Sequence, residues 1–271
     1  MTMKNDSINS PIGIFDSGLG GLTVVKAVRE RMACEDVIYY GDTAHVPYGS
    51  KSQETILSFT QDAVDFFLSH SVKCIVIACN TATALALPEI QETSPVPVLG
   101  VIEAGARAAI AASQNYKIGV IGTQATIASE AYTKTLRKLN PACAIYAHPC
   151  PLFVPLVEEG WLDRAATKMV IAEYLTPLKM AQIDTLILGC THYPLLAAGI
   201  SEFLGPEVKL VDSASSCAEE LEGILKERGL LRSEGSGSET FFVTDGAAKF
   251  AETGSRFLGR SLQAIKFTPS K

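Results

Sequence analysis

The chain has 271 residues, of which 47% are hydrophobic and 19% are charged, and its formal net charge is −6. This length and composition suit one large domain or two small ones, with ample apolar material for a packed core. The acidic balance offers no basic stripe, so we expect no nucleic-acid partner.

Targeting and metal signals are missing from the sequence. The N-terminal segment MTMKNDSINSP has no apolar stretch of the kind found in signal peptides, and no run of 18 or more apolar residues exists. The seven cysteines are odd in number and show neither CxxC nor zinc-type spacing. We therefore expect a cytoplasmic protein with reduced thiols, no membrane span, no disulfide framework and no metal.

Short apolar runs alternate with amphipathic segments along almost the whole chain. The runs are nearly continuous in apolar residues, which is typical of strands buried on both faces. The predicted strands are 12–15, 37–40, 74–78, 98–101, 117–121, 144–146, 185–188, 208–211 and 239–244.

The segments between these runs have helical spacing. Leu22, Val25, Val28 and Met32 would share one helix face, and residues 163–181 form a longer helical segment. Strand–helix alternation predicts an α/β fold of doubly wound, mainly parallel sheets.

Two stretches of the chain resemble each other. VKCIVIACNTATAL (72–85) aligns with IDTLILGCTHYPLL (183–196), so that Cys79 falls on Cys190. IGIFDSG (12–18) aligns with IGVIGTQ (118–124) at nearly the same offset, which matches Ser17 to Thr123. These matches favour two similar halves over coincidence.

The two matched cysteines each follow a buried strand and precede a predicted helix. Ligands of open α/β sheets bind beyond the carboxyl ends of the strands, and a helix N-terminus lowers the pKa of a thiol. Free cysteine is more often a small core residue. That reading suits the other five cysteines, but Cys79 and Cys190 are followed by the polar pairs Asn80–Thr81 and Thr191–His192.

Two thiols from two similar halves suit one particular reaction. A racemase removes a proton from one face of a carbon and returns a proton on the other face, which requires a thiolate base and a thiol acid. The alternative is a redox disulfide, which requires Cα atoms within about 7 Å of each other. The sequence leaves that separation open.

Two further motifs follow predicted strands. FDSGLGG (15–21) is not a nucleotide-binding glycine pattern. Asp16 in it could accept from a substrate ammonium group and Ser17 could donate to a carboxylate, or the pair could form an ordinary N-cap. In YYGDTAHVPYGS (39–50), residues 47–49 could form a plain turn or present backbone N–H groups to an anion.

The motifs FDSGLGG, YYGDTAHVPYG, ACNTAT and GCTHYP, in this order, resemble those of glutamate racemases, in the cofactor-independent Asp/Glu racemase family. The resemblance runs from about residue 12 to 211. It implies interconversion of L- and D-glutamate without a cofactor, supplying D-glutamate for peptidoglycan and hence for cell-wall biogenesis and cell shape.

The resemblance also implies roles for individual residues. Cys79 and Cys190 would be the two bases, assisted by Asp16, His192 and Glu158, although the neighbouring Glu159 could be the matching acid. The implied substrate contacts are Asp16, Ser17, Tyr48, Gly49, Asn80, Thr81, Thr123, Thr191 and His192.

The family fold implies two α/β domains that are pseudo-symmetric about an interdomain cleft, the first built from residues 1–99 and 212–271 and the second from 100–211. Family members are commonly homodimers. An aspartate or hydantoin racemase would use the same pair of cysteines, a ligand-binding module would need neither thiol, and a thiol–disulfide protein would link them.

Overall fold

The computed structural model describes residues 7–268. The expectation for the N-terminal segment therefore falls partly on residues outside the described part. The described chain forms two compact units, one made of the residues up to Val101 together with those from Ala214 onward, the other of Ile102–Ser213.

The first unit is built on a six-stranded parallel sheet of order β10-β9-β2-β1-β3-β4. All five residues of β1 are buried, as expected for an inner strand that helices cover on both faces. The strands are β1 (Ile12–Asp16), β2 (Val37–Gly41), β3 (Cys74–Ile77), β4 (Val98–Gly100), β9 (Glu239–Val243) and β10 (Ala264–Lys266).

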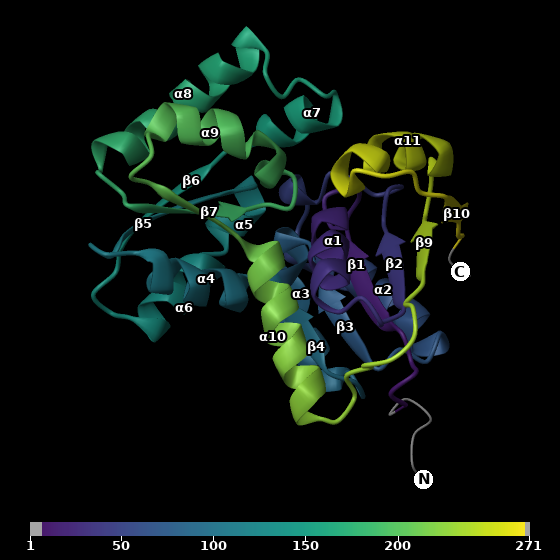
Figure 1. Ribbon diagram of the computed structural model, residues 1–271. Coiled ribbons are helices and arrows are strands. Elements are labelled where there is room, and N and C mark those ends of the chain that lie inside the picture. Colours follow the sequence, from purple (N-terminus) through teal and green to yellow (C-terminus); the bar gives the residue numbers. More distant parts are fainter. Residues whose placement is uncertain (1–6, 269–271) are drawn as a thin grey trace. The chain divides into compact units, whose positions relative to one another are not determined.

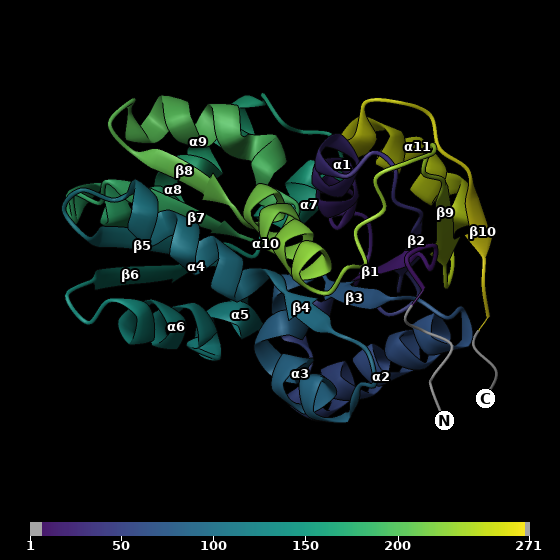
Figure 2. The ribbon, with the colours of Figure 1, turned by 60° about the horizontal axis from the view of Figure 1, so that its bottom comes forward.

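Helices lie on both faces of this sheet (Figures 1 and 2). One face carries α2 (Gln53–Ser69) and α3 (Asn80–Thr93), and the other carries α1 (Leu22–Arg31) and α11 (Ala247–Leu258). The unit also contains α10 (Ser213–Glu227), whose first residue is the last of the second unit.

Aromatic residues fill the core beneath α2. The ring of Tyr40 lies 4.9 Å from that of Phe66 and 6.2 Å from that of Phe67. Gly13 on β1 makes this packing possible, because a Cβ there would lie 2.8 Å from the Phe67 ring. The helix thus packs closely on the strand that leads to Asp16.

A fully buried ion pair lies at the opposite, amino end of β3. The Lys73 ammonium group donates to Glu35 at 2.5 Å and to the carbonyl oxygens of Ile8 and Leu230. Glu35 also accepts from the backbone N–H of Arg232. Removing one partner of such a pair costs about 3–5 kcal/mol, so this contact joins the N-terminal part of the unit firmly to its C-terminal segment.

The second unit contains a four-stranded parallel sheet of order β6-β5-β7-β8. Helices α4 and α6 lie on one face and α8 and α9 on the other (Figure 1). The strands are β5 (Lys117–Gly122), β6 (Ala144–Pro149), β7 (Thr185–Gly189) and β8 (Lys209–Asp212), and the helices are α4 (Val101–Ala112), α5 (Gln124–Ala128), α6 (Ala131–Leu139), α7 (Phe153–Glu158), α8 (Ala165–Met180) and α9 (Ala197–Leu204).

The predicted fold class is confirmed, since both sheets are parallel and helices alternate with strands. Each of the nine predicted strands is present. The three-residue strand β10 was missed, and β6 is half-exposed rather than buried on both faces because it lies at a sheet edge. Among residues 7–268, no helix combines the length and apolar character needed to span a bilayer.

Candidate active site

The carboxyl edge of the first sheet brings several predicted site residues into one row. Strand register places Asp16 opposite Gly41, and Gly41 opposite Val243. Phe15 pairs with Ile77, two residues before Cys79. Parallel strands end at a common edge, so Ser17, Asp42 and Cys79 follow neighbouring strands within this unit.

Asp16 and Ser17 form the turn that leaves β1. The Asp16 side chain is fully buried and accepts a hydrogen bond from the Gly18 N–H at 2.9 Å. The N-cap of α1 is Gly21, which supplies no side-chain hydrogen bond. The alternative of an ordinary N-cap at Asp16 or Ser17 is therefore wrong. A Cβ on Gly21 would lie 2.5 Å from that of Asp16, which explains the glycine.

Cys79 occupies the N-cap position of α3, a helix of 14 residues. Its side chain is 5% exposed, and its Sγ donates to the Ser17 hydroxyl oxygen at 3.6 Å. Asn80 and Thr81 are the first two residues of the helix and are buried. The partial positive charge of a helix N-terminus stabilises a thiolate, so this position favours ionisation of Cys79.

Asp42 collects side chains from its own loop and from the C-terminal part of the chain. Its carboxylate accepts from the Tyr48 hydroxyl at 2.6 Å, from His45 Nδ1 at 2.8 Å and from the Thr244 hydroxyl at 2.9 Å. Burial and the neighbouring Asp42 charge raise the pKa of Tyr48 far above its ordinary value. The Tyr48 hydroxyl thus gives its proton to Asp42, which leaves the backbone N–H groups of residues 48 and 49 as the donors that this turn could offer a substrate.

The second sheet arranges its own row at the carboxyl edge. Gly122 at the end of β5 pairs with both Pro149 and Gly189, so Thr123 lies between Cys150 and Cys190 across the sheet. Thr123 is the N-cap of α5 and accepts from the Thr126 N–H at 3.2 Å. The repeat partner of Ser17 therefore has a capping role that Ser17 lacks.

Cys190 has an imidazole beside it instead of a helix start. Its Sγ lies 4.0 Å from His192 Nδ1, and the thiol is 6% exposed. The helix expected directly after Cys190 is a 3-10 helix that begins only at Tyr193, and α9 starts at Ala197. Pro194 near the start of that turn lacks the N–H that an α-helix continuing from Cys190 would use.

The far side of the His192 ring faces a carboxylate. Its Nε2 lies 3.1 Å from Glu158 Oε1, at the end of α7. Glu159 caps the same helix and is exposed to solvent. Of the two candidate acids, the structure places Glu158 beside His192. A carboxylate in this position fixes which ring nitrogen carries a proton, so it controls the nitrogen presented to Cys190.

Tyr193 anchors the turn that carries Cys190 and His192. Its buried hydroxyl donates to the Cys150 carbonyl oxygen at 2.8 Å, and its ring packs edge-on against Phe153 at 5.2 Å. Phe153 is the first residue of α7, so one side chain links the thiol-bearing turn to the helix that supplies Glu158.

Four of the five remaining cysteines are buried, as expected for core residues. Burial raises the pKa of Cys74 and of Cys217 to about 12, and burial also raises that of Cys150 above its ordinary value. These thiols stay protonated at neutral pH. Cys143 is buried and Cys34 is half-buried, and all seven cysteines are free.

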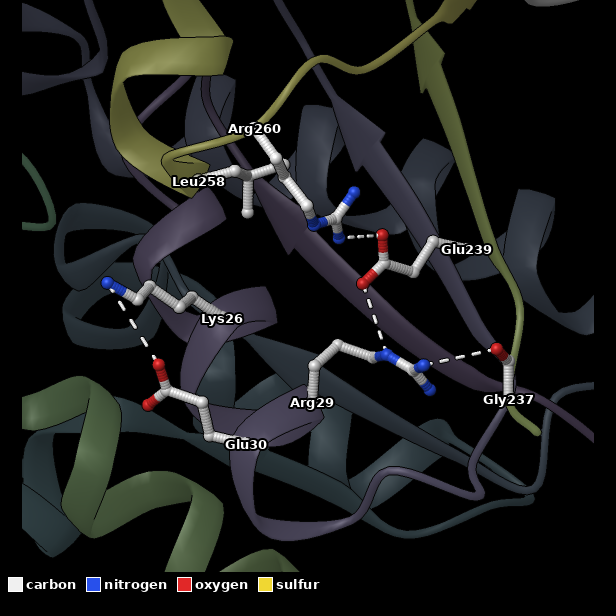
Figure 3. Close-up of a pocket in the computed structure, with 7 residues that line it drawn as sticks. All are labelled: Lys26, Arg29, Glu30, Gly237, Glu239, Leu258 and Arg260. Atoms are coloured by element: carbon white, nitrogen blue, oxygen red, sulfur yellow. Dashed lines mark hydrogen bonds and ion pairs between the residues drawn. The ribbon is translucent and has the colours of Figure 1, made fainter. Parts of the chain in front are cut away.

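A hollow of about 440 Å³ lies away from this row, beside the amino end of β9 (Figure 3). Glu239, the first residue of β9, forms ion pairs with Arg29 and Arg260. Arg29 also donates to the Gly237 carbonyl oxygen, and Lys26 pairs with Glu30. The charges that line the hollow are paired with one another, so we assign it no ligand.

Comparison with known proteins finds a family and relatives that match this chain over most of its length. The family model of Asp/Glu/Hydantoin racemase matches residues 22–221. A glutamate racemase of Syntrophus aciditrophicus is 48% identical over 264 residues, which cover 97% of this chain and 98% of that protein.

Solved structures of glutamate racemases are also similar to this chain over nearly its whole length. A glutamate racemase isoform from Bacillus anthracis is 40% identical, with a TM-score of 0.94 over 97% of this chain and 99% of that one. A Francisella tularensis glutamate racemase, crystallised with D-glutamate, is 40% identical, with a TM-score of 0.90 over 96% of this chain and 98% of that one.

Proposed function

The chain belongs to the Asp/Glu/Hydantoin racemase family, and we propose that it acts as a glutamate racemase, an isomerase that uses Cys79 and Cys190 as its two bases. One observation carries the mechanism. Each unit presents a thiol at the carboxyl end of an inner strand, and each thiol has a different polar partner. A reaction that needs one base and one acid, with roles that exchange, suits such a pair.

The proposed step is proton transfer at Cα of glutamate. Cys79 as thiolate takes the α-proton of D-glutamate, and the Cys190 thiol donates its proton to the opposite face to give L-glutamate. In the reverse direction Cys190 takes the proton and Cys79 returns one. No bond other than C–H and S–H is broken or formed, so the reaction balances without an oxidant or a reductant.

The charge that develops at Cα spreads onto the α-carboxylate. Donors aimed at that carboxylate stabilise the transition state more than the ground state. We assign this role to Ser17, Asn80, Thr81 and Thr191, with Thr123 and the backbone at Tyr48–Gly49 as further contacts. Asp16 would accept from the substrate ammonium group and assist Cys79, while His192 and Glu158 would assist Cys190.

The thiols need activation because an ordinary cysteine has a pKa of about 8.5 and is only a few per cent ionised at neutral pH. Cys79 has the N-terminus of α3 for this purpose. Cys190 has the His192–Glu158 pair, which can accept or supply a proton through Nδ1. These are two separate physical routes to a reactive thiol.

The proposal also covers the biological role of the enzyme, its location and its assembly. The product D-glutamate would serve peptidoglycan synthesis, and hence cell-wall biogenesis and cell shape. Seven free cysteines suit a reducing compartment, in accordance with a cytoplasmic location. We also propose that the enzyme works without a cofactor and as a homodimer, as is common in the family.

The decisive experiment is racemisation in D2O. The protein, dialysed and without added cofactor, is incubated with L-glutamate and separately with L-aspartate in the presence of a reductant, while optical rotation and loss of the α-proton signal are followed. We expect glutamate to lose rotation as it gains deuterium at Cα. Inert glutamate with active aspartate would replace the proposal with an aspartate racemase, and two inert substrates would favour a ligand-binding role.

A further inference from the structure

The C-terminal strand of the first unit ends against the loop that carries Tyr48 and Gly49. Thr244 directly follows β9 and lies beyond residues 22–221, the span of the family-model match. Its backbone N–H donates to the Gly41 carbonyl oxygen at 3.1 Å, which extends the pairing of β9 with β2 by one step. Thr244 is therefore held at the edge where the candidate site residues stand.

The Thr244 side chain makes two hydrogen bonds to the loop after β2. Its hydroxyl donates to Asp42 Oδ1 at 2.9 Å and accepts from the Ala44 N–H at 2.8 Å. The next residues add a reciprocal pair, in which Thr43 Oγ1 donates to the Asp245 carbonyl oxygen and accepts from the Asp245 N–H. Residues 42–44, at the start of the loop, are thus hydrogen-bonded to residues 244 and 245 of the C-terminal segment.

The second oxygen of Asp42 carries the connection onward. Asp42 is 3% exposed, and its Oδ2 accepts from the Tyr48 hydroxyl at 2.6 Å. Tyr48 begins the 3-10 turn of residues 48–50, and its ring packs against Phe15 and Phe59. A buried carboxylate that has lost one donor would be less well fixed, so the turn would lose part of its support.

We propose that Thr244 is a positioning residue for substrate binding, which acts through Asp42 on the backbone of Tyr48 and Gly49. The proposal rests on the proposed function, because it takes that turn as part of the glutamate site. It means that the residue directly after strand β9 contributes to substrate binding. Thr244 itself touches no reacting atom in this scheme.

The test compares Thr244→Val with Thr244→Ser and with Thr60→Val. Valine removes the hydroxyl at nearly constant shape, while serine keeps it. Thr60 is the matched control, since it is also buried in the first unit but its hydroxyl donates only to the Ile56 carbonyl oxygen of its own helix. If Thr244→Val fails to fold, Thr244→Ala takes its place.

For Thr244→Val we expect KM for both glutamate isomers to rise about tenfold while kcat changes by less than about twofold, as when binding common to ground and transition states is lost. Thr244→Ser and Thr60→Val should stay within about twofold of the wild type. Tyr48→Phe should raise KM similarly, and the double variant should be little worse than the worse single one, because both act through Asp42. Fully additive effects, or a Thr244→Val enzyme that matches Thr60→Val, would overturn the proposal.

Amide hydrogen exchange provides a readout that does not depend on glutamate. The amides of residues 43–50 should exchange faster in Thr244→Val than in the wild type. In Thr60→Val their exchange rates should equal those of the wild type. If the wild type leaves glutamate untouched, the proposed function fails, and the exchange data alone decide whether Thr244 holds the loop. Unaltered exchange at 43–50 would contradict the inference even in an active enzyme.

Discussion

Cys79 and Cys190 occupy equivalent places on two parallel sheets, but their surroundings differ. Cys79 caps a 14-residue helix and donates to the Ser17 hydroxyl. Cys190 precedes an irregular turn and lies beside His192, which is paired with Glu158. The strand and the thiol are repeated in the two units, but the polar groups next to the thiol are different.

The same proposed role, that of a reactive thiol, is therefore supported by two different electrostatic environments. A helix N-terminus stabilises negative charge without moving a proton. An imidazole with a carboxylate behind it can exchange a proton with the thiol and then hold the resulting charge. In the proposed racemase, two equivalent thiols would therefore act as acid and base with the help of different neighbouring groups.

The largest expected effect comes from removing either thiol. Cys79→Ala and Cys190→Ala should each lower racemisation by more than about 10³-fold in both directions, since a positioned acid or base contributes about 10²–10⁴-fold and the reaction needs both. Exchange in D2O separates the two. Cys190→Ala should still exchange the α-proton of D-glutamate alone, and Cys79→Ala that of L-glutamate alone.

The controls for that experiment are cysteines from the same units. Cys74 starts the strand that leads to Cys79, and Cys143 is buried in the second unit. Cys74→Ala and Cys143→Ala should keep activity within about twofold below their melting temperatures, with the loss confined to stability. Near-normal racemisation by Cys79→Ala would exclude the two-thiol mechanism, and exchange of the same isomer by both alanine variants would erase the distinction between the thiols.

A smaller effect should mark the carboxylate behind His192. Glu158→Gln keeps the shape of the side chain but removes the charge that orients the imidazole, so we expect kcat to fall about tenfold. Glu159→Gln, at the exposed neighbouring position, should stay within about twofold. Steady-state kinetics in both directions measures the difference. Equal kinetics in the two variants would remove Glu158 from the site.

Much of this arrangement could be predicted from the sequence. Buried strands follow from continuous apolar runs, and the offset between 72–85 and 183–196 indicates two like elements. The sequence could not reveal that Thr123 caps a helix while Ser17 does not, because the backbone after β1 turns through glycines before α1 begins. The two similar motifs differ in the geometry that follows them.

The contacts between distant residues were also beyond the sequence. Sequence patterns point to no partner for Asp42 or His45, yet both belong to one hydrogen-bonded network with Thr244. About 200 positions separate Asp42 from Thr244. The only signal was a threonine at the end of a predicted strand, and its contacts depend on the strand order that places β9 beside β2. The choice between Glu158 and Glu159 depended in the same way on helix phase.

The smallest effects should separate Ser17 from Thr123, the two residues that the repeat aligns. Ser17→Ala removes the hydroxyl that accepts from Cys79, and we expect kcat/KM to fall several-fold, about 1 kcal/mol for one hydrogen bond, at unchanged stability. Thr123→Ala removes an N-cap, so thermal unfolding should show a loss of about 1 kcal/mol. Its kcat/KM should fall less than that of Ser17→Ala. Should Thr123→Ala lose more activity and less stability than Ser17→Ala, the hydroxyl of Thr123, and not that of Ser17, would be the one that contacts substrate.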